Sequence, residues 1–329
     1  MSEQHILDAD PKRVANFLRE RDWIDADSHV TAVTRAGEGN MNLVLRVSLV
    51  GGTADSVILK QARPWVEKFP EIEAPVERME VETAFYRLAA REPALVRRMP
   101  QLLAADPEQH AALFEDLGEA RDYTACYGSR VITRDEAAAL LDWLGHLHAL
   151  EVDAAQWPEL ANRSMRALNR IHIFDLPLDP DTGPDADEFC PGLGRIAQTL
   201  RADTALARRM QELAAEYERD GSTLLQGDYY PGSWLETAQG PAIIDPEFGH
   251  LGAAEFDLGV FQAHLHFTGS AIDTLNGYAP TGSFDTRLSD AFAGAELIRR
   301  LLGVAQLPIA ADLAQRERWL ELGRELVLS

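Results

Sequence analysis

Three acidic residues lie in loops that directly follow short apolar runs. Asp228 lies in the segment QGDYYPGS (residues 226–233), and Asp245 and Glu247 lie in IIDPEFG (residues 243–249). A carboxylate just past a buried strand is held at a rigid edge, where it can bind a metal ion or accept a proton. Alternate side chains of an extended segment share a side, so Asp245 and Glu247 could reach one cation, with Pro246 fixing the turn between them.

The spacing of these acids predicts that they meet in space. Positions 228 and 245 are 17 apart, which is enough for a strand, a turn and a return strand, and that path would bring Asp228 near Asp245. Acids that simply face solvent in loops are the commoner alternative. From the residues alone, a chemical site and a solvated pair of loops both stay open.

A lysine at the end of an apolar strand is a further candidate. Lys60 closes the run VILK (residues 57–60). It could deter edge-to-edge aggregation, or it could contact phosphate if an acid of the next helix held it, either Glu82 or Glu80. The segment GEGNMN (residues 37–42) could bring backbone amides close to phosphates. It lacks the GxxxxGK[ST] and GxGxxG patterns, so a plain hairpin turn explains it equally well.

The elements that must position these residues fall into two groups. The first group is rich in strands. Residues 32–61 predict an antiparallel meander, in which Leu43, Leu45 and Val47 alternate with more polar positions. An irregular connection (64–75), a helix (76–93) and two short strands near 100–104 and 111–114 follow. A short helix after Asp10-Pro11 should pack on this part of the chain.

The second group is mostly helical. Helices are predicted within residues 135–150, 164–178, 193–220, 256–269 and 289–307, with small strands near 224–225, 234–235 and 242–244. The segment EDLGEARDY (residues 115–123) is interpreted as a linker, with the boundary between 117 and 118. His264 and His266 are two apart on a predicted helix, so they should point to different faces and serve structural roles.

Composition narrows the classes of function. The 329 residues carry 53 acidic and 31 basic side chains, a net charge of −22. This balance disfavours binding to nucleic acid and to anionic membrane surfaces. The two cysteines form no disulfide framework, and the chain shows neither a signal peptide nor an apolar run long enough for a membrane span. We therefore expect a soluble, cytoplasmic protein.

Seven segments, in this order, resemble the aminoglycoside phosphotransferase and choline kinase superfamily, which has a protein-kinase-like fold. Within it the chain is most similar to methylthioribose kinases. GNMNLVLRV is similar to the phosphate-loop corner, VILKQA to the lysine strand and VERMEVETAFY to the helix with its acid partner. LGHLHAL resembles the helix before the catalytic loop, QGDYYPGSW that loop, and IIDPEFG the metal-binding Asp-x-Glu segment. LIRRLLGVAQ resembles a twin-arginine helix of methylthioribose kinases.

The resemblance implies an α+β fold of two lobes with ATP in the cleft between them. Residues 1–117 would be a small antiparallel nucleotide-binding lobe with a helix, and residues 118–329 a larger, mostly helical lobe for catalysis and acceptor binding. The implied enzyme is an ATP- and Mg²⁺-dependent phosphotransferase acting on an alcohol group, here a hydroxyl of a methylthioribose-like sugar. Such a reaction requires mainly positioning and charge stabilisation. A homodimer is implied by resemblance only.

Residue roles follow from the same resemblance. Asp228 would position, and could deprotonate, the acceptor hydroxyl. The implied magnesium ligands are Asp245, Glu247 and Ser233. The implied ATP-binding residues are Lys60 with its partner Glu82, Asn40 and Asn42 of the phosphate loop, and the backbone groups of Glu115 and Leu117, with Asp116 between them. The implied acceptor-binding residues are Arg299, Arg300 and Tyr229. Adjacent helix positions point about 100° apart, so at most one arginine should reach the substrate.

Two departures from the family pattern leave other functions open. Gln226 replaces a histidine that usually begins the catalytic loop and is regarded as structural, so catalysis should survive. Tyr229 and Tyr230 replace the more usual leucine and histidine beside Asp228. The alternatives are a phosphotransferase for an aminoglycoside, choline or another five-carbon sugar, a catalytically silent nucleotide-binding protein, and a metal-dependent hydrolase built on the same acids.

Overall fold

The computed structural model describes residues 6–37, 41–270, 278 and 283–329. The chain divides into two compact units, Met1–Ala120 and Arg121–Ser329. The expected boundary at 117/118 lies just before this division. Strands dominate the first unit and helices the second, which confirms the predicted α+β class. None of the described helices is both long and apolar enough to cross a membrane.

The first unit is built on a five-stranded antiparallel sheet in the order β1-β2-β3-β7-β6. Its strands are β1 (His29–Arg35), β2 (Leu43–Val50), β3 (Ser56–Gln61), β6 (Leu102–Asp106) and β7 (Ala111–Glu115). Alternate β2 residues are buried as their pattern predicts, and they pack with Val14, Phe17 and Leu18 of α1 (Pro11–Glu20). The Asp10 carboxylate caps α1 by accepting hydrogen bonds from the amides of Lys12 and Arg13.

A helix and a small hairpin complete this unit. Helix α2 (Arg78–Ala89) packs on the sheet, with the rings of Tyr86 and Phe114 4.9 Å apart. The short helix α3 (Pro93–Val96) follows α2. The stretch expected to be irregular instead contains two strands, β4 (Trp65–Val66) and β5 (Phe69–Glu73), which pair with each other.

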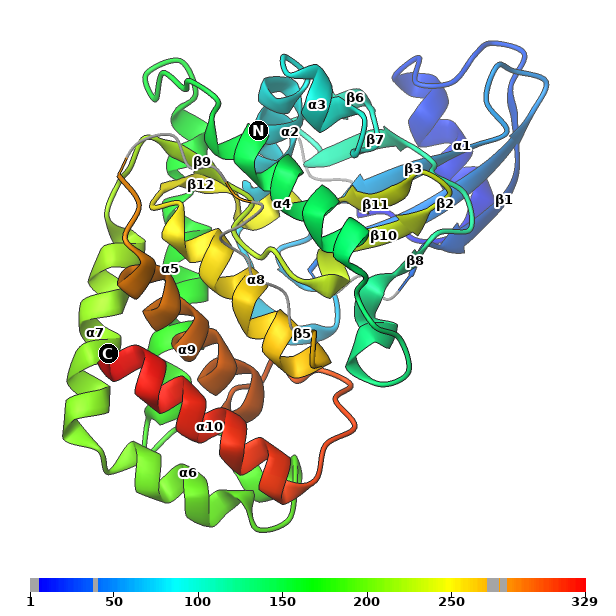
Figure 1. The fold of residues 1–329 in the computed structure, drawn as a ribbon. Helices are drawn as coiled ribbons and strands as arrows, with labels where there is room; N and C mark the ends of the chain where they lie inside the picture. The colour runs from blue at the N-terminus through cyan, green and yellow to red at the C-terminus, as the bar shows by residue number, and fades with distance from the viewer. Residues whose placement is uncertain (1–5, 38–40, 271–277, 279–282) are drawn as a thin grey trace. The chain divides into compact units, whose positions relative to one another are not determined.

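The second unit contains most of the helices. They are α4 (Arg134–His148), α5 (Arg163–Arg170), α6 (Leu193–Arg201), α7 (Thr204–Glu218), α8 (Glu255–Thr268), α9 (Thr286–Leu302) and α10 (Leu313–Leu328). Helix α9 packs between α8 and α10, and these three lie side by side in yellow, brown and red in Figure 1. No element was expected after residue 307, yet α10 buries Leu320 and Val327 in the core of this unit.

Short strands and turns carry the loops of interest. β9 (Thr223–Leu225) pairs with β12 (His250–Gly252), and β10 (Trp234–Thr237) lies between β11 (Gly240–Ile243) and β8 (Arg121–Asp122). Single helical turns are formed by Tyr123–Tyr127, Pro158–Ala161, Leu176–Leu178, Ala186–Glu188, Pro231–Ser233 and Pro246–Phe248, and a π-helical turn by Ile171–Asp175. The hairpin β10–β11 supplies the strand, turn and return strand expected between Asp228 and Asp245.

Candidate active site

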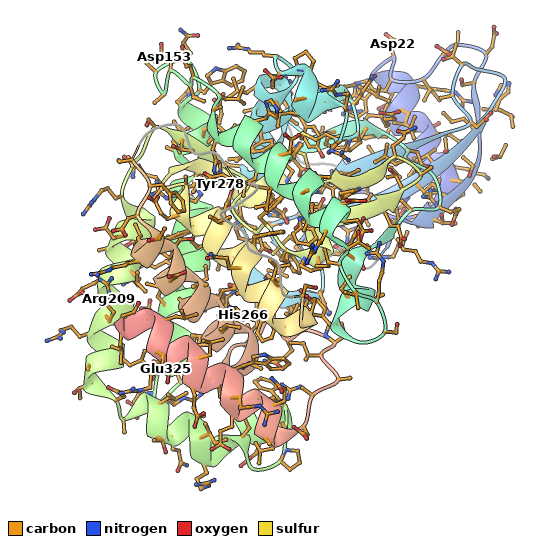
Figure 2. All side chains as sticks on the ribbon, in the orientation of Figure 1. Asp22, Asp153, Arg209, His266, Tyr278 and Glu325 are labelled. Carbon is orange, nitrogen blue, oxygen red and sulfur yellow. The ribbon has the colours of Figure 1, made fainter. Side chains whose placement is uncertain are left out.

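The loop that carries Asp228 is fixed by a buried carboxylate. The amides of Gln226 and Gly227 donate to the two oxygens of Asp257, at 2.6 and 2.9 Å. His148 of α4 contacts the same carboxylate at 3.3 Å and also meets the hydroxyl of Tyr278, which Figure 2 labels. Gly227 has a φ of +87°, and a Cβ there would lie 2.2 Å from the carbonyl oxygen of Phe248. Only glycine fits this close approach.

The side chain of Gln226 joins this loop to the segment that carries Asp245. Its Oε1 accepts from the amide of Asp228 at 2.8 Å. Its Nε2 donates to the carbonyls of Ile244 at 3.1 Å and Asp245 at 3.3 Å. A buried glutamine therefore acts as a donor and an acceptor at once, which is the bonding capacity of a neutral histidine. This gives a structural reason why glutamine can occupy the position.

The Asp245 segment is set by its backbone. Asp245 follows β11 with a φ of +56°, an uncommon conformation for a residue other than glycine. Pro246–Phe248 then form a single helical turn in which Glu247 is buried. The side-chain Nδ2 of Asn162 donates to the carbonyls of Glu247 and Gly249, at 3.0 and 2.9 Å. Conformational strain of this kind often accompanies function.

Carboxylate oxygens suit magnesium, so the residues of this segment fit the expected ion. Ser233 is buried, and its hydroxyl donates to the Asp228 carbonyl at 2.9 Å. That bond leaves hydroxyl lone pairs for a ligand. Within the described residues, no three or more His, Cys, Asp or Glu side chains are grouped to hold a metal ion. The residues that would hold a magnesium ion here are Asp245 and Glu247, with Ser233 beside them.

Both arginines of α9 converge on Asp228. Arg300 Nη2 lies 3.0 Å and Arg299 Nη1 lies 3.5 Å from the same oxygen, Oδ1. Both reach the same carboxylate because their long side chains compensate for the 100° between their Cα–Cβ directions, and the expectation that at most one of them reaches the substrate stays a prediction. Among the described residues, Asp228 Oδ2 has no hydrogen-bond partner. One oxygen is thus engaged and the other is available to an incoming hydroxyl.

A buried glutamate holds the arginine pair in place. Glu296, which is 1% exposed, accepts from Arg300 Nε at 2.5 Å and from Arg299 Nη1 at 3.0 Å. Burial alone would raise the pKa of Glu296, but the two guanidiniums outweigh it and hold the pKa well below its usual range. Burial opposes ionisation of Arg300 as well, while Glu296 and Asp228 raise its pKa. The charges of Arg299 and Arg300 are therefore balanced by those of Glu296 and Asp228.

A histidine and a tyrosine extend this network. His264 Nε2 lies 3.2 Å from Glu296, and His264 Nδ1 lies 2.6 Å from the Tyr127 hydroxyl. Burial lowers the pKa of His264 although Glu296 opposes the shift. A neutral ring must donate from Nε2 to the carboxylate and accept from Tyr127 at Nδ1. His266, labelled in Figure 2, is exposed, so the two histidines of α8 do face opposite ways.

Tyr229 does not have the environment expected of an acceptor ligand. Its side chain is 0% exposed, its hydroxyl donates to the Leu140 carbonyl at 2.9 Å, and its ring stacks on Trp143 at 5.6 Å. The placement in the acceptor pocket is corrected on this basis, because a packed core side chain cannot meet a substrate. The guanidinium carbon of Arg300 instead lies over the ring of Tyr230, 4.5 Å from the ring centre.

In the first unit, a buried ion pair matches the predicted lysine and acid. Lys60 Nζ lies 2.8 Å from Glu82 Oε1, and both side chains are almost fully buried. The alternative acid, Glu80, instead contacts His110 Nδ1 at 2.8 Å. The structure therefore selects Glu82 as the partner of Lys60. A carboxylate that contacts the ammonium group fixes its direction, as a phosphate contact requires.

The phosphate-loop residues can be described only in part. Asn40 lies outside the described residues. Asn42 is 2% exposed, and its Oδ1 accepts from Arg78 Nε at 2.7 Å. Arg78, which sequence reasoning missed, is fully buried and also donates to the Met41 carbonyl at 2.9 Å. The Asn42 side chain therefore fixes the corner through Arg78, and a direct contact with ATP stays a prediction.

The segment expected to meet adenine follows β7. The amide of Glu115 donates to the Gln101 carbonyl at 2.9 Å, so Glu115 could offer a nucleotide only its carbonyl. Leu117 is half-buried. Between them, the carboxylate of Asp116 binds back to the sheet through Arg46 and Ser56.

Comparisons with known proteins agree with this geometry. A family model described as "Phosphotransferase enzyme family" (APH) matches residues 46–279. A methylthioribose kinase of Exiguobacterium sibiricum is 27% identical over 325 residues, with 85% of this chain and 80% of the relative covered. A methylthioribose kinase of Bacillus pumilus is 25% identical over 338 residues, with 88% and 82% covered.

Solved structures share the fold. The choline kinase LicA of Streptococcus pneumoniae superposes with a TM-score of 0.50 at 12% identity, covering 96% of this chain and 98% of that one. A macrolide 2′-phosphotransferase of type I gives a TM-score of 0.50 at 16% identity, covering 99% of both chains. At such low identity these likenesses show the fold alone.

The fold is that of a protein-kinase-like phosphotransferase. The chain belongs to the phosphotransferase enzyme family, whose model spans well over half of its length. It is a small-molecule kinase that transfers phosphate from ATP to a hydroxyl group.

Proposed function

We propose that this protein phosphorylates a hydroxyl of methylthioribose or a closely related 5-modified ribose, using ATP and magnesium. The observation that carries the proposal is the convergence of Arg299 and Arg300 on Oδ1 of Asp228. Relatives named methylthioribose kinase, at 25–27% identity over most of the chain, support the sugar class.

The two guanidiniums beside Asp228 suit the phosphate that is transferred. They lie within 3.5 Å of the carboxylate that would receive the acceptor hydroxyl, and Glu296 and Asp228 offset their charge before phosphate arrives. The arginines would attract the phosphate as it passes to the acceptor. Support for the sugar class comes from the relatives named methylthioribose kinase and not from the charge of the site.

The proposed chemistry assigns a separate task to each group. Asp228 Oδ2 accepts a hydrogen bond from the acceptor hydroxyl and so directs its oxygen at the γ-phosphorus. The new O–P bond forms as the bond from phosphorus to the β,γ-bridging oxygen breaks, and the hydroxyl proton passes to Asp228 or to the phosphate product. Arg299 and Arg300 stabilise the charge on the transferred group.

The remaining residues would bind the nucleotide. Lys60, oriented by Glu82, would contact the ATP phosphates. Asp245 and Glu247, with Ser233, would hold magnesium, which supplies positive charge to the phosphates when bound. In the nucleotide-binding unit, Asn40 and Asn42 would shape the phosphate corner, while Glu115 and Leu117 would meet the adenine. All these roles are proposals drawn from the place of each residue in its sequence motif.

A panel of acceptors tests the proposal. Purified protein with ATP and magnesium is assayed for ADP release with methylthioribose, ribose, an aminoglycoside and choline. We expect turnover on methylthioribose with the lowest KM of the panel, and none above background for the Asp228→Asn variant, which controls for contaminating kinases. Turnover on the aminoglycoside or choline alone would refute the sugar assignment. ATP binding without turnover on any acceptor would favour a silent nucleotide-binding protein.

A further inference from the structure

The carboxylate of Asp116 is buried and bound by several donors of the first unit. Its side chain is 3% exposed and accepts four hydrogen bonds. Oδ2 receives Arg46 Nε at 2.8 Å and the Ser56 hydroxyl at 2.7 Å, and Oδ1 receives Arg46 Nη2 at 3.2 Å and the Gly118 amide at 2.9 Å. The guanidinium thus makes a two-pronged contact, the strong and directional form of this pair.

Arg46 also forms hydrogen bonds with the residues that follow Asp116. Its Nη1 donates to Glu119 Oε1 at 2.5 Å, and its Nη2 donates to the Gly118 carbonyl. One guanidinium therefore contacts three residues of the segment 116–119. Gly118 has a φ of +80° with open space where a Cβ would lie, so its conformation, rather than crowding, favours glycine there.

We call Arg46, Ser56 and Asp116 the clamp. Two of its members, Arg46 and Ser56, belong to the centre of the sheet. Arg46 lies in β2, where it pairs with Ile58 of β3 and with Thr34 of β1, and Ser56 begins β3. The segment that they hold leaves the same sheet at the end of β7. If Arg46 served only to keep the surface soluble, it would need no buried partner. Burying the carboxylate of Asp116 is costly unless several donors compensate for its lost hydration. The arrangement instead holds the segment from Asp116 to Glu119, which directly follows Glu115 and includes Leu117, against the sheet.

We propose that Arg46, Ser56 and Asp116 are positioning residues for nucleotide binding. They set the backbone of Glu115 and Leu117 for the adenine ring, and so determine ATP affinity without taking part in phosphate transfer. The inference rests on the proposed placement of adenine at this segment. A preformed backbone binds more tightly because less ordering is required on binding.

The clamp can be loosened while the sheet is kept. Arg46→Lys retains the charge but loses the two-pronged contact, and Ser56→Ala removes one donor. We expect the Kd for ATP and the Kd for adenosine to rise by the same factor, about 10-fold for Arg46→Lys, the effect of losing one hydrogen bond to a charged group. The Kd for magnesium tripolyphosphate, which has no adenine, should not change. Arg13→Lys, in an exposed ion pair on α1, is the matched control.

Calorimetric titration at a temperature where every variant is folded distinguishes the outcomes. Unchanged adenosine affinity in both clamp variants would overturn the proposal. Equal weakening of ATP and tripolyphosphate would overturn it too, since that pattern indicates general damage. At saturating ATP the kcat of Arg46→Lys should equal that of the wild type. Because binding needs no acceptor, failure of the sugar assignment would leave these titrations intact and would be seen in the acceptor panel instead.

Discussion

Replacing Gln226 tests how the catalytic loop is held. Gln226→Ala removes the acceptor of the Asp228 amide and the donor to the carbonyls of Ile244 and Asp245. A buried polar group left unsatisfied costs about 1–3 kcal/mol. Since the amide loses its partner completely and the carbonyls share one donor, we expect a loss of about 2–4 kcal/mol in the free energy of unfolding. Gln198→Ala, on an exposed position of α6, should change it by less than about 0.5 kcal/mol.

The same substitution should slow the reaction. A misplacement of a reacting group by about 1 Å can cost 100-fold in rate, so we expect the kcat of Gln226→Ala to fall by about 10- to 100-fold. Gln226→His should retain most activity, because a neutral imidazole accepts at one nitrogen and donates at the other. Gln226→Glu should be at least as damaging as alanine, since its second oxygen would face carbonyl oxygens. The assays are urea unfolding and steady-state ADP release. Wild-type rate and stability in Gln226→Ala would refute the reasoning.

Four further outcomes are expected. Asp228→Asn should lower kcat by at least about 100-fold in the ADP-release assay and leave the Kd for ATP nearly unchanged, because the role proposed for Asp228 is at the acceptor. Asp245→Asn should weaken magnesium-dependent ATP binding in calorimetric titrations, whereas binding of adenosine should be preserved. Glu296→Gln should destabilise the fold by about 3–5 kcal/mol in urea, since it strips the buried arginines of an anion. His250 is fully buried, and burial lowers its pKa from 6.5 to about 4. Between these pH values the unfolded chain binds a proton that the folded chain does not, so the free energy of unfolding should fall by about 3 kcal/mol from pH 6.5 to 4. Urea unfolding at each pH should show this slope in the wild type and a flatter slope in His250→Gln.

Local sequence patterns were sufficient for most elements. Alternation at Leu43, Leu45 and Val47 predicted β2, and Asp10-Pro11 predicted the start of α1. Helix α10 was missed although Leu320 and Val327 lie at helical spacing, and their burial depends on the other helices of the unit. The pair β4–β5 was missed because proline and charge mask strands this short.

For the candidate site, the sequence suggested residues but not the contacts between them. Asp228 and the arginine pair were identified from their motifs, whereas Tyr229 was misplaced because adjacency to Asp228 says nothing about which way a side chain points. Asp257 supports the loop through the amides of Gln226 and Gly227, which lie 31 and 30 residues earlier in the chain. Its local signal is an acid in the first turn of a helix, a position that it shares with Glu255 and that also suits a helix N-terminus.

The partner of the arginines had a clearer signal. Glu296 precedes Arg299 and Arg300 by three and four residues, the spacing at which helical side chains meet. That spacing predicts the ion pairs, but it equally suits an exposed helix face. The burial of the group, and its link to His264 of another helix, depend on tertiary packing.

The central claim is most directly tested by identifying the product. Protein, ATP, magnesium and methylthioribose are combined, and the mixture is followed by ³¹P NMR and mass spectrometry. We predict a new phosphomonoester signal from a singly phosphorylated sugar, in equal amount to the ADP formed and absent with Asp228→Asn. ADP that accumulates together with inorganic phosphate and unmodified sugar would contradict the account.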